Sequence, residues 1–223
     1  MKIFLDTAHV EEIREAASWG ILDGVTTNPS LVSKEARSFD DILHEIVKIV
    51  KGPVSAEVVA EKSEDMVEQG VRLSAIAPNI VVKIPMTAEG LKAIRQLTER
   101  EINTNCTLIF NATQGLLAAK AGATFVSPFI GRLDDAGQIG MELIGQLVTI
   151  FDNYAMTTEV LAASIRHPLH VIDSALHGAD ACTMPLKILQ QIIRHPLTDL
   201  GNANFTKDWQ KLAPKDRAAA TRS

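Results

Sequence analysis

The most informative residue of this 223-residue sequence is a lysine inside an apolar segment. Lys83 lies in the run VVKIP at positions 81–85, which is typical of a buried strand. Burial favours the neutral amine over the ammonium, and a neutral amine can attack a carbonyl group to form a Schiff base. The alternative is a structural lysine paired with Glu57 or Asp6, because interior lysines are rare unless they are paired.

Two carboxylates stand at the ends of other apolar segments and could face this lysine. Asp6 follows the run Ile-Phe-Leu, and Glu57 follows the segment 54–56. One of them could abstract a proton while the other moves protons during imine formation. Together with Thr107 they suggest a proton relay. Each carboxylate taken alone could instead be a rim group that pairs with Lys83 or Arg132.

A second group of polar residues suits a phosphate. Arg132 follows the apolar segment 125–130, and Ser164 and Arg166 precede Pro168, a residue favoured in the first turn of a helix. Guanidinium groups, a hydroxyl and a helix N-terminus together bind phosphate well. For either arginine alone, a solvated surface position is the alternative.

Two further motifs allow a structural and a functional interpretation. The run TTNPS at 26–30 contains Asn28, which suits a sugar hydroxyl but could also cap the helix that follows. His167 and His170 are spaced for a metal, yet no acidic or cysteine partner follows at ligand spacing. We therefore expect no metal site.

The elements that position these residues alternate along the chain. Eight β-like runs are separated by amphipathic helical stretches, which predicts parallel strands with helical crossovers. The expected strands are 3–6, 24–28, 54–58, 80–84, 102–109, 125–130, 159–164 and 179–183. Because no linker interrupts them, we predict one closed (β/α)8 TIM barrel with an additional C-terminal helix at 197–212. The alternative, an open doubly wound sheet, lacks its glycine fingerprint after the first strand.

The active site of such a barrel lies at the C-terminal ends of its strands. Residues spaced by two along a strand point to the same side, so the polar pairs of this sequence are expected to enter the barrel together. They are Asp6, Thr26, Asn28, Ser55, Glu57, Lys83, Asn105, Thr107, Ser127, Ser164 and Arg166. A purely structural interior would be apolar. We expect residues 1–213 to form one domain and residues 214–223 to be a disordered tail.

Composition excludes several classes of function. The 22 basic residues are scattered and are outnumbered by 27 acidic ones, which argues against a nucleic-acid binder. Cys106 and Cys182 fit no zinc pattern, so we expect free thiols in a reducing compartment. No signal peptide and no apolar run of about 18 residues is found. The sequence predicts a soluble cytoplasmic protein with no membrane partner.

Five motifs in order along the chain resemble the transaldolase family, in particular its short single-barrel members, which include fructose-6-phosphate aldolases. The motifs are FLDTA at 4–8, GVTTNPS at 24–30, VVKIP at 81–85, NTNCTL at 103–108 and SPFIGR at 127–132. The resemblance implies a class I mechanism without metal or cofactor, in which Lys83 forms a Schiff base with a ketose phosphate. Glu57 would then move protons through a water held with Thr107, and Asp6 would take the C4 hydroxyl proton.

The resemblance also implies how substrates are held and which reaction follows. Thr26 and Phe129 would line the site; Asn28, Asn105 and Ser127 would hold the dihydroxyacetone hydroxyls, and Arg132, Ser164 and Arg166 the phosphate. A dihydroxyacetone unit would move from sedoheptulose 7-phosphate or fructose 6-phosphate to glyceraldehyde 3-phosphate or erythrose 4-phosphate, as in the pentose phosphate pathway.

Two positions and the C-terminal helix refine this expectation. The simple aldolases carry Gln and Tyr where this chain has Glu57 and Phe129, which favours a transaldolase. A fructose-6-phosphate aldolase is the alternative, and a barrel that binds sugar phosphates without catalysis is a further one. Short members of the family form rings, often decamers, and the apolar stripe of Phe205, Trp209 and Leu212 fits a homo-oligomer in which this helix reaches a neighbour.

Overall fold

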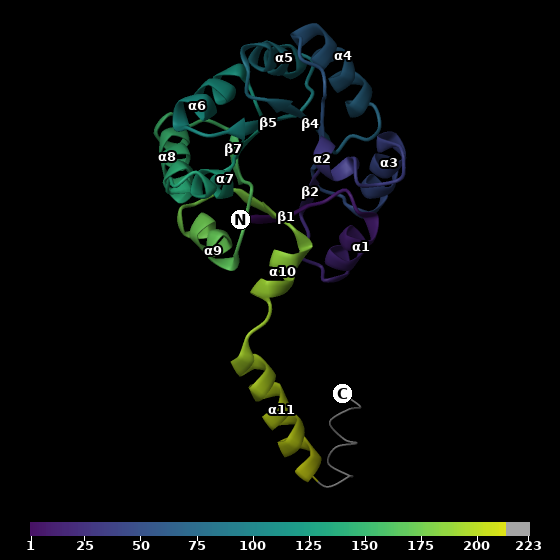
Figure 1. Ribbon diagram of the computed structural model, residues 1–223, viewed down its shortest axis with the longest axis vertical. Coiled ribbons are helices and arrows are strands. Elements are labelled where there is room, and N and C mark those ends of the chain that lie inside the picture. Colours follow the sequence, from purple (N-terminus) through teal and green to yellow (C-terminus); the bar gives the residue numbers. More distant parts are fainter. Residues whose placement is uncertain (213–223) are drawn as a thin grey trace. The chain divides into compact units, whose positions relative to one another are not determined.

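Eight parallel strands close into a barrel in the computed structural model, which describes residues 1–212 (Figure 1). Each strand pairs with the next along the chain, and the last pairs with the first. The (β/α)8 barrel prediction is therefore confirmed. The strands are β1 (Lys2–Asp6), β2 (Gly24–Thr26), β3 (Val54–Glu57), β4 (Ile80–Pro85), β5 (Thr104–Ile109), β6 (Phe125–Pro128), β7 (Glu159–Ala162) and β8 (Ala181–Met184).

Helices follow the strands, and those from α1 to α9 surround the barrel (Figure 1). The helices are α1 (Val10–Ser18), α2 (Pro29–Val32), α3 (Phe39–Ile49), α4 (Ser63–Ser74), α5 (Ala88–Thr98), α6 (Ala112–Ala121), α7 (Ile130–Asp135), α8 (Gly140–Asn153), α9 (Pro168–Leu176) and α10 (Leu186–Ile192). Local chemistry explains where several begin. Ser38 and Asn111 accept hydrogen bonds from backbone N–H groups three residues later, as expected of helix N-caps.

An apolar layer fills the part of the barrel interior that lies toward the N-terminal ends of the strands. Phe4, Val81, Phe125, Leu161 and Ala181 are buried there against one another, and the rings of Phe4 and Phe125 meet edge to face. A Cβ atom at position 24 would lie 2.6 Å from the Phe4 ring, so glycine is required beside it. This layer closes the barrel toward the N-terminal ends of its strands. The polar residues predicted for the site lie on the other side of it, at the C-terminal ends.

Several strands are shorter than the sequence predicts, among them β2 and β6. The structure ends β2 at Thr26 because Asn28 already caps α2. It ends β6 at Pro128, and the short helix α7, which was not predicted, begins at Ile130. A Cβ atom at Gly131 would collide with the Ser164 carbonyl oxygen. Only glycine therefore lets the chain turn into a helix so close to the end of β7.

The chain divides into two compact units, and the second begins at Leu189. This unit contains α11 (Pro196–Lys211), which confirms the predicted C-terminal helix. Several large apolar side chains near or on it are exposed, namely Leu197, Leu200, Phe205, Trp209 and Leu212. A single domain over 1–213 stays a prediction, and the tail 214–223 lies outside the described residues. Within residues 1–212, no helix is long and apolar enough to cross a membrane.

Both cysteines are buried free thiols. Burial raises the pKa of Cys106 and of Cys182 to about 12, so about one thiol in 10⁴ is ionised at pH 8, and the thiolate is the reactive form. We expect a thiol-specific chromogenic reagent to detect no thiol in the native protein at pH 8 and two after unfolding in denaturant. Rapid labelling of either cysteine in the native protein would contradict this.

Candidate active site

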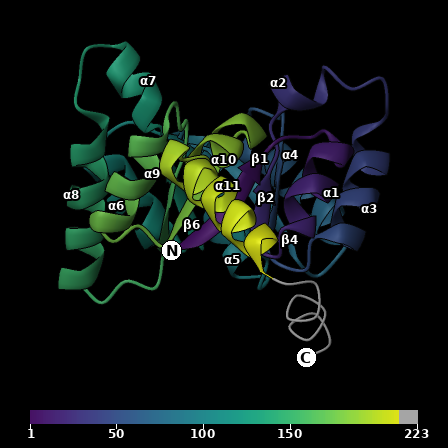
Figure 2. The same cartoon turned by 90° about the horizontal axis from the view of Figure 1, so that it is seen from below.

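The C-terminal ends of the strands carry a layer of polar side chains in register. Glu57 on β3 pairs with Lys83 on β4, and Lys83 pairs with Asn105 on β5. The short helices α2 and α7 stand at one and the same end of the barrel (Figure 2). Since paired residues of parallel strands point to the same face, the three side chains enter the barrel side by side, above the apolar layer.

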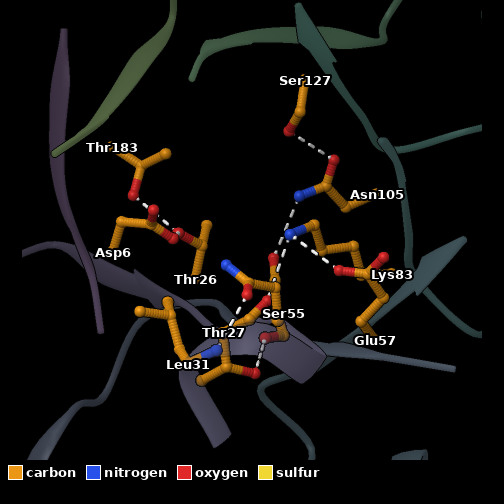
Figure 3. A network of polar contacts seen from close by, with 11 residues as sticks. Asp6, Thr26, Thr27, Leu31, Ser55, Glu57, Lys83, Asn105, Ser127 and Thr183 are labelled. Carbon is orange, nitrogen blue, oxygen red and sulfur yellow. Dashed lines mark hydrogen bonds and ion pairs between the residues drawn. The ribbon is translucent and has the colours of Figure 1, made fainter. Parts of the chain in front are cut away.

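Lys83 is buried and paired. Only 4% of its surface is exposed, its Nζ lies 3.0 Å from Glu57 Oε2, and it donates a hydrogen bond to the Thr27 carbonyl oxygen at 3.1 Å (Figure 3). Of the two interpretations left open by the sequence, the structure shows the ion pair with Glu57. The pair also allows nucleophilic chemistry, because a proton can pass from the ammonium to the adjacent carboxylate and leave a neutral amine.

Thr107 supplies an unsatisfied hydroxyl beside this pair. Its Oγ1 is buried and has no hydrogen-bond partner among the described residues, and it lines a cavity together with Glu57 and Lys83. The next residue, Leu108, has a positive φ of 60° within an irregular stretch of β5, and such bulges re-aim side chains. Because buried hydroxyls are normally paired, this atom suits a bound water or a substrate hydroxyl.

Asp6 is held by a directed chain of hydroxyl groups (Figure 3). Thr26 Oγ1 donates to Asp6 Oδ1 at 2.7 Å and also lies 2.7 Å from Thr183 Oγ1. Since the single proton of Thr26 goes to the carboxylate, Thr183 must donate to Thr26. The sequence assigned no role to Thr183. Its position two residues after the inward-facing Ala181 was the signal that it points into the barrel.

A second polar contact group lies around Asn105, which is fully buried. Its Nδ2 donates to Ser55 Oγ at 3.1 Å, and its Oδ1 accepts from Ser127 Oγ at 2.8 Å. The two serines therefore fix the amide from both sides. Asn28 caps α2, because its Oδ1 accepts from the Leu31 N–H at 3.0 Å, which is the capping role that the sequence left open.

Two adjoining cavities occupy this end of the barrel. One, of about 160 Å³, is lined by Asp6, Thr26, Ser127, Ser164, Arg166 and Thr183 among others. The other, of about 410 Å³, is lined by Glu57, Thr107 and residues of α2. Asn28, Lys83, Phe129 and Arg132 line both. The lysine amine therefore stands where the two cavities meet, with Asp6 on one side and Glu57 on the other.

Both arginines line the smaller cavity and are exposed. Arg132, on α7, places its guanidinium 4.9 Å from the centre of the Phe129 ring. Arg166 forms an exposed ion pair of 2.8 Å with Asp135. Ser164 stands between them in chain order with a positive φ of 62°. The structure thus brings every predicted site residue to one end of the barrel and leaves both guanidinium groups accessible to an anion.

Comparison with known proteins finds similarity to one family of enzymes. The family model described as transaldolase/fructose-6-phosphate aldolase matches residues 3–221. A probable transaldolase of Herpetosiphon aurantiacus is 62% identical over 212 residues, covering 95% of this chain and 96% of its own. A probable transaldolase of Aquifex aeolicus is 57% identical over 215 residues, covering 96% and 99%.

A solved structure of a mandelate oxidase mutant with an FMN adduct is similar in fold. It superposes with a TM-score of 0.57 at 14% identity, covering 83% of this chain and 64% of that one. At this level of identity the likeness concerns the barrel alone and carries nothing about flavin chemistry.

Proposed function

The chain belongs to the transaldolase/fructose-6-phosphate aldolase family, and on that premise we propose that it is a transaldolase of the pentose phosphate pathway. It transfers a dihydroxyacetone unit from sedoheptulose 7-phosphate or fructose 6-phosphate to glyceraldehyde 3-phosphate or erythrose 4-phosphate. The observation that carries this proposal is the buried Lys83 amine, 3.0 Å from Glu57, at the junction of two cavities.

The first stage forms a Schiff base. Lys83 passes a proton to Glu57, and the neutral amine attacks the C2 carbonyl of the ketose phosphate. Glu57, acting through a water held by the unpaired Thr107 hydroxyl, returns this proton to the C2 oxygen and then moves a second proton there from the attacking nitrogen, so that the oxygen leaves as water. The product is an iminium ion on Lys83.

The second stage breaks a carbon–carbon bond. Asp6 takes the proton of the C4 hydroxyl, the C3–C4 bond breaks, and its electron pair moves into the iminium to give an enamine. The aldose phosphate leaves, and the enamine attacks the aldehyde of the acceptor while the same steps run in reverse. Asp6 is suited to this task because the hydroxyl chain from Thr183 through Thr26 fixes its orientation.

Substrate contacts follow from the lining of the cavities. Asn28, Asn105 and Ser127 are assigned to the hydroxyls of the dihydroxyacetone unit, with Phe129 as an apolar wall. Arg132, Ser164 and Arg166 are assigned to the phosphate, since paired guanidinium groups bind a phosphate with directed, charge-assisted hydrogen bonds. The phosphate replaces Asp135 as the partner of Arg166.

The test is the release of glyceraldehyde 3-phosphate from fructose 6-phosphate, measured with and without erythrose 4-phosphate. Release that requires the acceptor, with sedoheptulose 7-phosphate formed in equal amount, is the expected result. Equal release without acceptor would identify an aldolase instead. If there is no release, and borohydride with fructose 6-phosphate adds no mass to Lys83, the chain is a binding protein.

Phe129 is expected to suppress hydrolytic release of the dihydroxyacetone unit, because an apolar ring offers no proton to the enamine. The Phe129→Tyr variant should raise the ratio of cleavage to transfer by about tenfold, since the new hydroxyl can take part in proton transfer. Both rates are measured in the assay above. The matched control is Phe110→Tyr, on the ring that packs edge-on against Phe129; an unchanged ratio in the Phe129 variant would contradict the prediction.

We also propose a cytoplasmic homo-oligomer, in the form of a ring, in which the exposed apolar residues of α11 pack on a neighbouring subunit. Exposed apolar surface of this extent on one helix commonly marks a protein interface. Light scattering of the purified protein measures the subunit number.

A further inference from the structure

A buried histidine links the segment after β6 to the segment after β7. His170, in the first turn of α9, is only 6% exposed. Its Nδ1 accepts a hydrogen bond from the Arg166 backbone N–H at 3.2 Å, and its Nε2 lies 2.8 Å from Asp134 Oδ2. The other oxygen of Asp134 accepts from the Gly140 N–H at 2.8 Å. Every polar atom of the imidazole and both carboxylate oxygens are therefore engaged.

These partners determine the tautomer of the ring. Nδ1 faces an N–H donor, and Nε2 faces a carboxylate, so the neutral ring with its proton on Nε2 satisfies both contacts. Burial and the adjacent His167 lower the pKa of His170, while Asp134 and Asp173 raise it. The net direction is downward, which keeps Nδ1 an acceptor at neutral pH.

The segment that His170 holds adopts an unfavourable backbone conformation. Ser164 has a φ of 62°, a left-handed value that residues with a side chain rarely adopt and that persists only where the surroundings hold it. One restraint is the close approach of Gly131 to the Ser164 carbonyl. The other is the hydrogen bond from the Arg166 N–H to His170.

We infer that His170 is a positioning residue for anion binding: its Nδ1 holds the Arg166 backbone N–H and so keeps Arg166 in place beside Arg132, while Asp134 sets the tautomer that makes Nδ1 an acceptor. Asp134 lies two residues after Arg132 on the same short helix, so the link joins both arginine-bearing segments. The exposed Arg166–Asp135 ion pair does not serve this purpose, because exposed pairs contribute little to stability. This inference rests on the proposed function only in assigning the anion as the phosphate of a sugar.

The test separates the two hydrogen bonds of the ring. In His170→Asn the side-chain oxygen replaces Nδ1 and keeps the bond to Arg166, whereas in His170→Gln the longer side chain reaches Asp134 and loses that bond. By calorimetry, the Kd for inorganic phosphate should rise about tenfold in His170→Gln and stay within about twofold in His170→Asn. His177→Gln, at an exposed histidine after α9, is the matched control and should leave Kd unchanged.

The kinetic readout distinguishes positioning from a general structural role. In His170→Gln, KM for fructose 6-phosphate should rise about tenfold, while kcat and borohydride trapping of unphosphorylated dihydroxyacetone on Lys83 stay within about twofold. Equal impairment of the Asn and Gln variants, or a parallel loss of dihydroxyacetone trapping, would overturn the inference. So would a phosphate affinity that none of the variants changes.

A second variant covers the case in which His170→Gln does not fold. In Asp134→Asn the side-chain oxygen still accepts from the Gly140 N–H, so the new NH2 group donates to Nε2 of His170. The ring proton then moves to Nδ1. Nδ1 can no longer accept the hydrogen bond from the Arg166 N–H, because two donors face each other. Phosphate affinity should fall although a negative charge near the arginines has been removed. A rise in affinity overturns the inference. If the wild-type protein binds phosphate, these variants weaken that binding, and no sugar transfer occurs, the inference stands and the proposed function fails.

Discussion

Replacing Lys83 with methionine is expected to lower kcat for dihydroxyacetone transfer by about 10⁵-fold, because no other described group at the junction of the two cavities can form an imine. Methionine has nearly the length of lysine and fills the same space without an amine. The measurement is the acceptor-dependent release of glyceraldehyde 3-phosphate, together with mass spectrometry after borohydride reduction with fructose 6-phosphate. The wild-type protein should gain covalent mass on Lys83, and the variant should gain none.

The control for this prediction is Lys92→Met. Lys92 is an exposed lysine on α5 that pairs with Glu89, so its loss should leave both activity and labelling intact. Because Lys83→Met leaves Glu57 partly buried without its cation, the melting temperature is measured in parallel, to show that the variant is folded. Substantial covalent labelling of a folded Lys83→Met protein would place the nucleophile elsewhere.

Replacing Asp6 with asparagine is expected to lower kcat by about 10³-fold while leaving the Schiff base intact, within the range usual for removal of a general base. The amide oxygen can still accept the hydrogen bond from Thr26 that orients the wild-type carboxylate, so the geometry is preserved and only the proton acceptor is lost. Borohydride reduction should therefore trap the substrate on Lys83 as efficiently as in the wild-type protein.

Asp23→Asn provides the matched control for Asp6→Asn. Asp23 precedes β2, at the opposite end of that strand from the site, and accepts a hydrogen bond from the Ile3 N–H, which the amide oxygen can also accept. We expect its kcat to match the wild type. Loss of trapping along with turnover in Asp6→Asn would show that Asp6 is needed for imine formation, and the division of labour between Asp6 and Glu57 would be wrong.

The sequence by itself determined the barrel and most of the site. Alternating apolar runs and amphipathic stretches predict eight parallel strands, because the periods of burial differ between strand and helix. Lys83 could be singled out because burying a charge within an apolar strand costs free energy unless the charge is paired. Pairs such as Asn105 and Thr107 could be assigned to the interior, since alternate residues of a strand face the same side.

Only the tertiary structure decided how these residues are connected. The sequence left open whether Lys83 pairs with Glu57 or with Asp6, and the strand register places Glu57 opposite it on β3. It assigned no role to Thr183, which reaches Thr26 only because β8 closes the barrel against β1. It assigned His170 no structural role, because the contact with Asp134 joins two helices, α7 and α9, that are distant in the sequence. Local sequence patterns predict which way a side chain faces, whereas the closure of the barrel decides which residues far apart in the sequence come into contact.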